Sequence, residues 1–193
     1  MLVLKLPTDP RWVNIAEKNI QEILTDHAFC EIKAASTAIS LMVSFPEYTE
    51  LVKDMPSLAK EEMCHFELVH KIIIDRGWTL GRDRKDHYVI KLLSFFPKGG
   101  SRTTQLIHRI LYAALIEARS CERFKLLSEN LKDKELSVFF KSLMKSEAGH
   151  YTLFLNFARK YGDRKIVDEK WQNLLTYEAE IIKNLGSNET MHG

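Results

Sequence analysis

Two tetrapeptides, E-M-C-H at residues 62–65 and E-A-G-H at residues 147–150, share the pattern E-x-x-H inside long helical stretches. Residues i and i+3 lie on one face of a helix, so each tetrapeptide can present a carboxylate and an imidazole to one metal ion. A single E-x-x-H is a weak signal, because it occurs by chance in many proteins. The residues around the two tetrapeptides therefore decide whether they form a metal site.

Two further glutamates precede the tetrapeptides at nearly equal distances. The interval from Glu31 to Glu62 equals that from Glu117 to Glu147 to within one position. A common offset between the two halves of the chain also relates Glu62 to Glu147 and His65 to His150, and it relates Glu31 to Glu117 with a difference of one position. Chance does not easily produce this repeat. It predicts two equivalent helix pairs whose metal ligands are Glu31, Glu62, His65, Glu117, Glu147 and His150.

The residues around the two upstream glutamates support this assignment. Glu31 is the only acidic residue between Asp26 and Glu47, and an isolated carboxylate in an apolar helix is costly to bury unless it is paired or metal-bound. Glu117 shares its helical face with apolar residues, whereas Glu122 points about 140° away from it. The spacing therefore selects Glu117 as the ligand.

The charges and ligand types predict which metals the site takes. Four glutamates bring four negative charges to two divalent cations, and a neutral site of this kind is tolerated in an apolar bundle. Carboxylates with imidazole suit iron or manganese, and the absence of ligating thiols argues against structural zinc or an iron–sulfur cluster. We expect Glu62 and Glu147 to bridge the two metals and Glu31 and Glu117 to be terminal ligands. His65 and His150 would each bind one metal.

The first half of the chain is predicted to form two long helices. Helical periodicity follows the Asp9-Pro10 start signal from about residue 10 to Phe45, with a break expected near Thr25-Asp26. A second stretch covers about residues 47–76, and we expect Pro56 to interrupt it and Ser57 to cap its longer part. Gly77 is placed to end it.

The second half repeats this organisation after a long connection. Residues 78–101 lose long periodicity and contain P-K-G-G, which indicates a crossover with a short helix at about residues 87–95. Helices are then expected over residues 102–129, 133–161 and 164–185. Strand signals are nearly absent. The expected fold is all-α: a ferritin-like four-helix bundle with a long crossover between helix pairs, plus additional terminal helices.

Length and composition are typical of one globular domain. The 193 residues are 45% hydrophobic and 28% charged, which argues against extensive disorder. We expect a single domain over residues 1–185 and a flexible tail over residues 186–193. No stretch approaches the roughly 20 apolar residues needed to cross a bilayer, and the N-terminus turns polar too soon for a signal peptide. A cytoplasmic protein is expected.

Cysteines and the remaining histidines are given structural roles. The three cysteines cannot all pair within one chain and form no C-x-x-C motif, so reduced thiols that pack as small apolar groups are expected for Cys30, Cys64 and Cys121. Four histidines have no comparable partner in the sequence pattern and are interpreted as surface or core residues: His27, His70, His87 and His108.

The run E-A-R-S-C-E-R-F at residues 117–124, together with the six ligands, resembles the bacterial tRNA hydroxylase family that acts on 2-methylthio-N6-isopentenyladenosine. The resemblance covers nearly the whole chain, and this run is far more specific than the ligand pattern, which many di-iron proteins share. No ligand position departs from the family pattern. The arginines of the run lie about 120° and 160° from the ligand face, which favours bracing of helices over RNA contact.

The resemblance implies a non-haem di-iron monooxygenase that hydroxylates the isopentenyl side chain of the modified adenosine in tRNA. Two iron ions would be the cofactor and dioxygen the co-substrate. The chain has no flavin or nicotinamide motif, so electrons would come from a separate reductase or ferredoxin-type partner. The sequence leaves the oligomeric state open.

The crossover is the candidate tRNA-binding segment. Residues 81–102 contain six basic and two acidic residues, which gives a local charge of +4 in a chain of net charge +2. Basic side chains on a crossover can bind phosphates. The alternative is a solvated loop with scattered charges. The candidates are Arg82, Arg84, Lys85, Lys98 and Arg102.

Three competing functions share part of this pattern. A ferritin-like ferroxidase or iron-storage protein would use the same ligands in a shell-forming subunit. A manganese catalase or rubrerythrin-type peroxidase would differ in its metal and in peroxide turnover. A metal-free helical interaction module would bind no metal at all.

Overall fold

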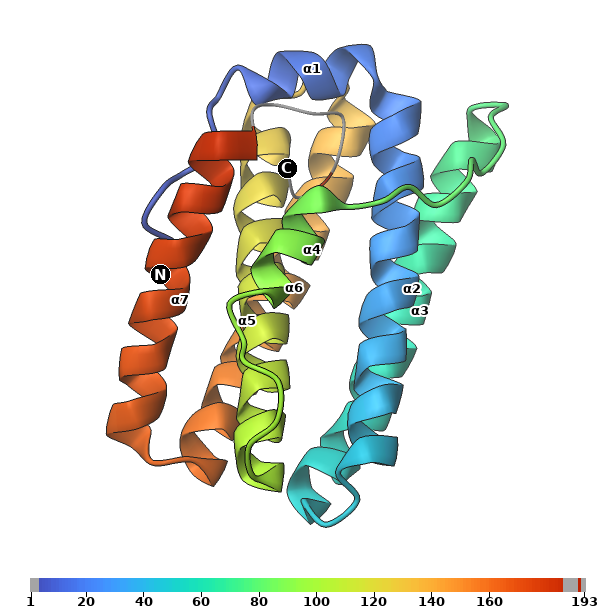
Figure 1. Cartoon of the computed structure of the whole chain (residues 1–193). Helices are drawn as coiled ribbons and strands as arrows, with labels where there is room; N and C mark the ends of the chain where they lie inside the picture. Colours follow the sequence, from blue (N-terminus) through green and yellow to red (C-terminus); the bar gives the residue numbers. More distant parts are fainter. Residues whose placement is uncertain (1–3, 186–190, 192–193) are drawn as a thin grey trace. The chain divides into compact units, whose positions relative to one another are not determined.

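A computed structural model describes residues 4–185 and Met191, and every regular element in this part of the chain is an α-helix (Figure 1). The helices are α1 (Trp12–Lys18), α2 (Ile20–Ser44), α3 (Thr49–Asp75), α4 (His87–Leu93), α5 (Arg102–Asn130), α6 (Lys134–Tyr161) and α7 (Arg164–Leu185). The all-α prediction is confirmed for the described residues.

The chain divides into two compact units. One contains α2, α3 and the loop that follows as far as residue 85, and the other contains α1, α4, α5, α6 and α7. The single domain expected over residues 1–185 stays a prediction. Most of the expected tail, residues 186–190 and 192–193, lies outside the described residues. Met191 is buried, and its backbone N–H donates to the Asp26 carboxylate at 2.7 Å.

Helices α2 and α3 form an antiparallel pair, joined by a short turn that contains Pro46. Both helices bury a stripe of apolar side chains at the i, i+3, i+4 spacing, and this burial provides most of the stability of a long amphipathic helix. The stripe consists of Leu24, Ala28, Ala35, Ala38 and Leu41 on α2 and of Leu51, Met55, Leu58, Val69 and Ile73 on α3. Gly77, at φ 73°, adopts the left-handed conformation that ends α3.

The break expected near Thr25-Asp26 is wrong. The helix is instead interrupted at Asn19, whose φ of −128° and ψ of 36° separate α1 from α2. Asp and Thr disfavour helices when their side chains compete for nearby backbone groups. The Asp26 carboxylate instead accepts from the backbone of Met191. Thr25 and Asp26 are both buried inside an uninterrupted α2.

The interruption expected at Pro56 is also wrong. Helix α3 continues through Pro56, so Ser57 does not cap a second helix. Proline removes one backbone hydrogen bond and normally breaks or kinks a helix interior. Here Met55 and Leu58, on either side of it, are buried against the rest of the core. Tertiary packing of the apolar face therefore outweighs the local cost.

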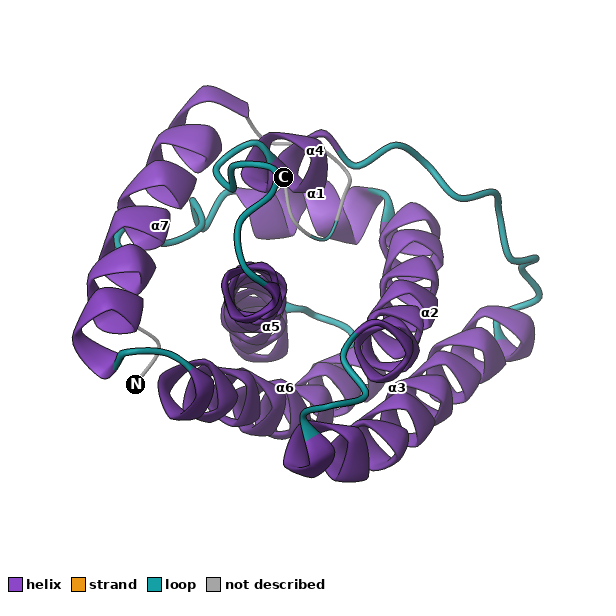
Figure 2. Ribbon diagram, turned by 60° about the horizontal axis from the view of Figure 1, so that its bottom comes forward, coloured by secondary structure: helices purple, strands orange, loops and turns teal. Residues whose placement is uncertain are grey.

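The second unit is built around the long α5 and α6 pair. Ser101 and Asp133 cap these helices, because their side chains accept from the backbone N–H groups of Thr104 and Leu136. Helix α7 packs against α6 and α4 (Figure 2). The short helix expected in the crossover is α4, capped by Asp86. The helices expected over residues 102–129, 133–161 and 164–185 are confirmed to within one residue.

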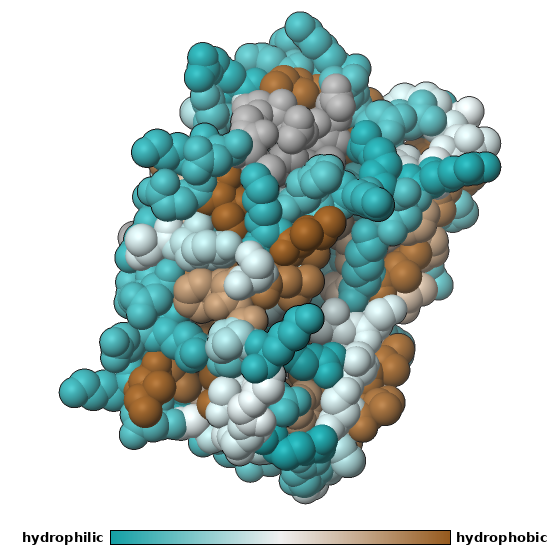
Figure 3. All heavy atoms as spheres, in the orientation of Figure 1, coloured by the Kyte–Doolittle hydropathy of each residue, from teal (hydrophilic) through white to brown (hydrophobic). Residues whose placement is uncertain are grey.

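The visible surface is mainly hydrophilic, with separate hydrophobic patches (Figure 3). Exposed apolar side chains include Val43, Val138 and Ile166. Among the described residues, no helix has the length and hydropathy that a bilayer crossing requires.

Candidate metal centre

The α2 and α3 pair brings three of the predicted ligands together. The Nδ1 atom of His65 lies 3.4 Å from Oε2 of Glu62 and 3.6 Å from Oε2 of Glu31. All three side chains are buried. Glu62 and His65 share one face of α3 through their i, i+3 spacing, and the antiparallel packing of α2 places Glu31 opposite them.

The α5 and α6 pair brings the other three ligands together in the same way. Ligand atoms of Glu117, Glu147 and His150 lie within 4.8 Å of one another. The Nδ1 atom of His150 is 3.8 Å from Oε2 of Glu147, and all three side chains are buried. The internal repeat seen in the sequence therefore corresponds to two equivalent clusters, one in each unit.

The donor set of each cluster fits a hard divalent cation. Two carboxylates and one imidazole offer oxygen and nitrogen ligands and two negative charges, and buried carboxylates are costly without a compensating cation. Such a cluster suits iron or manganese.

A family model described as tRNA-(MS[2]IO[6]A)-hydroxylase (MiaE) matches residues 1–193 of this sequence. The chain belongs to the MiaE family. A curated relative from Pseudomonas putida is named tRNA 2-(methylsulfanyl)-N(6)-isopentenyladenosine(37) hydroxylase and is 35% identical over 181 residues, 94% of this chain and 87% of the relative. A relative of the same name from Salmonella typhimurium is 28% identical, covering 81% of this chain and 75% of the relative.

A solved structure also resembles this MiaE-family chain. It is named "Protein 43 with aldehyde deformylating oxygenase activity from Synechococcus". The TM-score is 0.92 at 32% sequence identity, and the match covers 98% of this chain and 95% of the other. The similarity confirms the ferritin-like fold expected from the helix pattern.

One neighbour of the predicted ligands is missed by sequence reasoning. The sequence pattern gives His27 a surface or core role, but its Nε2 atom lies 2.5 Å from Oε1 of Glu31, and both side chains are buried. The signal available in the sequence is the i, i+4 spacing, which places His27 one turn before Glu31.

The other three histidines have the structural roles expected of them. His70 stacks on Phe66 with ring centroids 5.6 Å apart, and His87 is exposed at the start of α4. His108 lies 3.1 Å from Nζ of Lys170. Burial lowers the pKa of His108, and the Lys170 charge lowers it further, so the neutral ring accepts from the ammonium group.

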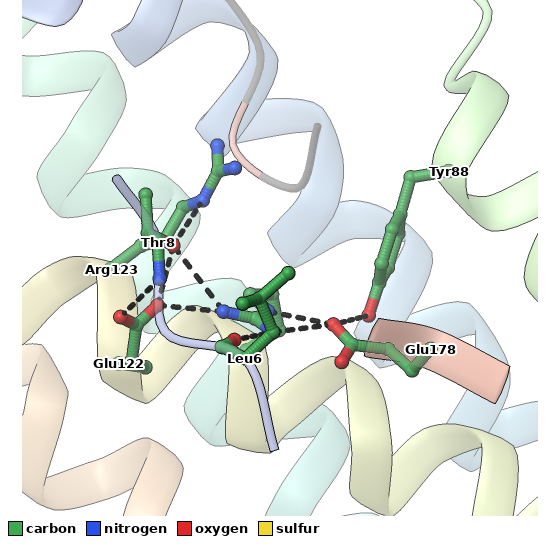
Figure 4. A network of polar contacts seen from close by, with 7 residues as sticks. Leu6, Thr8, Tyr88, Glu122, Arg123 and Glu178 are labelled. Carbon is green, nitrogen blue, oxygen red and sulfur yellow. Dashed lines mark hydrogen bonds and ion pairs between the residues drawn. The ribbon is translucent and has the colours of Figure 1, made fainter. Parts of the chain in front are cut away.

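The E-A-R-S-C-E-R-F run of this MiaE-family chain forms a buried polar network (Figure 4). Arg119, on α5, donates to Glu178 on α7 through Nη2 at 2.6 Å and through Nε at 2.8 Å. Its Nη2 also donates to the carbonyl of Leu6 at 2.9 Å, and the Tyr88 hydroxyl of α4 donates to Glu178 at 3.3 Å. Arg119 therefore ties α4, α7 and the N-terminal segment to α5.

Two more charged residues of the run, Glu122 and Arg123, extend this network. Glu122 accepts from the backbone N–H and the hydroxyl of Thr8, at 2.9 and 2.6 Å. Arg123 donates to the Thr8 hydroxyl at 3.3 Å and lies over the ring of Trp12, 4.2 Å from its centroid. Burial, reinforced by the Arg119 charge, lowers the pKa of Arg123 to about 10. The expected bracing role of the arginines agrees with these contacts, and Glu122 points away from the ligands as predicted.

The five candidate tRNA contacts differ in their surroundings. Arg82, Lys85, Lys98 and Arg102 are exposed. Arg84 is only half-exposed, and its guanidinium lies 3.4 Å from the carboxylate of Glu22. Arg84 therefore already has a local partner, whereas Arg82, Lys85 and Lys98 present their charges to solvent.

The cysteine thiols differ enough to predict their reactivity. Cys121 is buried and donates to the Met144 carbonyl at 3.3 Å, and burial, with the nearby Glu147 charge, raises its pKa to about 11. Cys64 is exposed. At pH 8 only about 0.1% of the Cys121 side chain is thiolate, the reactive form. We expect iodoacetamide to modify Cys64 at least about 100-fold faster than Cys121 in the folded protein.

Peptide mass spectrometry of timed alkylation samples measures the two rates. Unfolding in urea should make the two alkylation rates similar, because it removes the burial of Cys121. Equal rates in the folded protein would contradict the buried, protonated thiol.

Gly149 offers a test of the helix that carries two of the predicted ligands. It lies inside α6 between Glu147 and His150, and a Cβ built there meets no heavy atom within 4 Å. Glycine in a helix interior costs about 0.5–1 kcal/mol relative to alanine. We therefore expect Gly149→Ala to raise the free energy of unfolding by about 0.5–1 kcal/mol in urea denaturation. The reverse change at the neighbouring residue, Ala148→Gly, should lower the free energy of unfolding. A Gly149→Ala variant that is less stable than the wild type would show that the backbone here needs glycine.

Proposed function

We propose that this chain is an oxygen-dependent tRNA hydroxylase that acts on the isopentenyl side chain of 2-(methylsulfanyl)-N6-isopentenyladenosine. The observation that carries the proposal is the MiaE family match along residues 1–193. The two curated relatives are named for this activity. A tRNA substrate also supports the expected cytoplasmic location.

The six buried ligands are proposed to hold two iron ions. With both histidines neutral, the four glutamates carry four negative charges, which two divalent ions would balance. Iron, when bound, supplies the activation of dioxygen. The chain itself supplies the ligands and an apolar surrounding: Leu58, Val69, Leu143 and Phe154 are all buried on the helices that carry the E-x-x-H tetrapeptides. This surrounding limits access of water to the reaction.

The proposed reaction needs an external source of electrons. One oxygen atom of O₂ enters a C–H bond of the isopentenyl group, and the other leaves as water after taking up two electrons and two protons. The proposed donor is a reductase or ferredoxin-type protein, because the sequence has no flavin or nicotinamide motif.

The proposed tRNA-binding residues can be tested through salt dependence. We expect Arg82→Ala/Lys85→Ala to weaken tRNA binding and to reduce the slope of log K against log salt by about 1 for each lost phosphate contact. Fluorescence anisotropy with labelled tRNA at several salt concentrations measures both effects. Lys134→Ala/Lys141→Ala on α6 removes the same charge elsewhere, and an equal loss in this control would indicate non-specific attraction only.

Nucleoside mass spectrometry tests the function directly. tRNA carrying the isopentenyl modification is incubated with the iron-loaded, reduced protein and oxygen, then digested to nucleosides. The expected product has one additional oxygen atom on the modified adenosine and is absent without oxygen. A parallel incubation with a long-chain aldehyde tests for the activity named for the Synechococcus protein. An unchanged nucleoside, with or without a deformylated aldehyde, would overturn the proposal.

A further inference from the structure

His27 lies where it can orient one of the proposed ligands. It is on α2, one turn before Glu31, and its Nε2 atom is 2.5 Å from Oε1 of that carboxylate. Both side chains are at most 5% exposed. An ionised carboxylate has only acceptor atoms, so the imidazole must donate its N–H in this contact.

The two oxygens of Glu31 have different neighbours. Oε1 faces His27, whereas Oε2 lies 3.6 Å from Nδ1 of His65. The same Nδ1 atom is 3.4 Å from Oε2 of Glu62. The contact with His27 therefore leaves the other Glu31 oxygen directed at His65, which in turn lies beside Glu62.

The other half of the chain has no equivalent donor at this position. The offset that relates Glu31 to Glu117 places Ala113 at the position of His27. Ala113 is buried on α5, and its methyl side chain cannot donate a hydrogen bond. The internal repeat thus includes its own comparison: one terminal glutamate has a histidine one turn before it, and the other has an alanine.

We propose that His27 is a positioning residue that fixes Glu31 as a one-oxygen ligand and makes the two metal positions different. The inference rests on the proposed function. Outer-shell hydrogen bonds orient the ligands that bind a metal directly, and their loss typically lowers metal affinity about 10–100-fold. The ion bound by Glu31 and His65 should therefore depend on His27, and the ion bound by Glu117 and His150 should not.

Cobalt(II) binding to the metal-free protein tests this without any enzymatic turnover. The titration is done anaerobically against a competing chelator, and the visible absorption of cobalt reports the ligands of each ion. We expect two unequal ions in the wild type, and about 10–100-fold weaker binding of one ion in His27→Ala. His27→Gln, which keeps an N–H donor at similar reach, should restore most of the affinity and the wild-type spectrum.

Control variants distinguish a positioning role of His27 from an effect of the substitution on folding. His108→Ala removes another buried, hydrogen-bonded histidine, which lies about 13.5 Å along α5 from Glu117, and should leave cobalt binding unchanged. Circular dichroism of each metal-free variant checks the fold. If His27→Ala does not fold, His27→Leu, which fills more of the space and lacks the N–H, is compared with His27→Gln.

Two results would overturn the inference in different ways. Wild-type affinity and spectrum in His27→Ala or His27→Leu would exclude a positioning role while leaving the proposed function intact. A wild-type chain that binds no cobalt would instead refute the metal centre on which both proposals rest.

Discussion

Glu62→Ala and Glu147→Ala are each expected to lose both metal ions. Each residue is proposed to bridge the ions, so its removal takes a ligand from both. The loss of affinity should exceed the effect of outer-shell changes, which is about 10–100-fold, and hydroxylation of tRNA should fall below detection. Metal analysis after desalting, with circular dichroism to check the fold, measures the effect. Retention of two ions per chain by both variants would refute the site.

The effect of iron(II) on Tm is a second measurement that tests the site. Ions that bind only the folded state raise its stability, so iron(II) should raise the Tm of the wild type but not that of Glu62→Ala. Glu67→Ala is the matched control, since Glu67 is an exposed acidic residue on the same helix. It should bind two ions and respond to iron as the wild type does.

Arg119→Met should be the most destabilising change outside the proposed metal ligands. It leaves Glu178 buried without its guanidinium partner, and both side chains are fully buried in the wild type. Breaking a buried ion pair from one side typically costs about 3–5 kcal/mol, because the remaining charge is uncompensated. Urea unfolding followed by circular dichroism measures the loss.

Two further variants test the cause of that loss. Arg119→Met/Glu178→Leu removes both charges and should recover much of the stability. Lys125→Met breaks an exposed pair on the same helix, 3.9 Å from Glu129, and should cost less than about 1 kcal/mol. A small effect of Arg119→Met, similar to that of Lys125→Met, would contradict a stabilising role for the network.

The clustering of the proposed ligands could be predicted from the sequence because helical geometry is periodic. Glu62 and His65 lie on one face by their spacing alone. A second copy of the pattern later in the chain, with its own upstream glutamate at nearly the same interval, makes coincidence improbable. The end of α3 at Gly77 was also predictable, since that signal is local.

Features that depend on distant contacts were not predictable. The contact of Asp26 with Met191, 165 residues away, removes the reason to expect a break in α2. Packing of Met55 and Leu58 carries α3 through Pro56. The partners of Arg119 lie up to 113 residues away, and no periodic pattern links them to α5. The role of His27 had a local signal, but spacing alone does not distinguish it from other core histidines.

The paired clusters have a consequence for how such a protein can evolve. One helix hairpin with two glutamates and one histidine would supply half of a metal site, and two identical hairpins would supply a symmetric whole. Once both copies lie on one chain, each can mutate independently. His27 in one half and Ala113 in the other differ in this way. Duplication followed by fusion thus gives a way to obtain two chemically distinct metal positions from one ancestral motif.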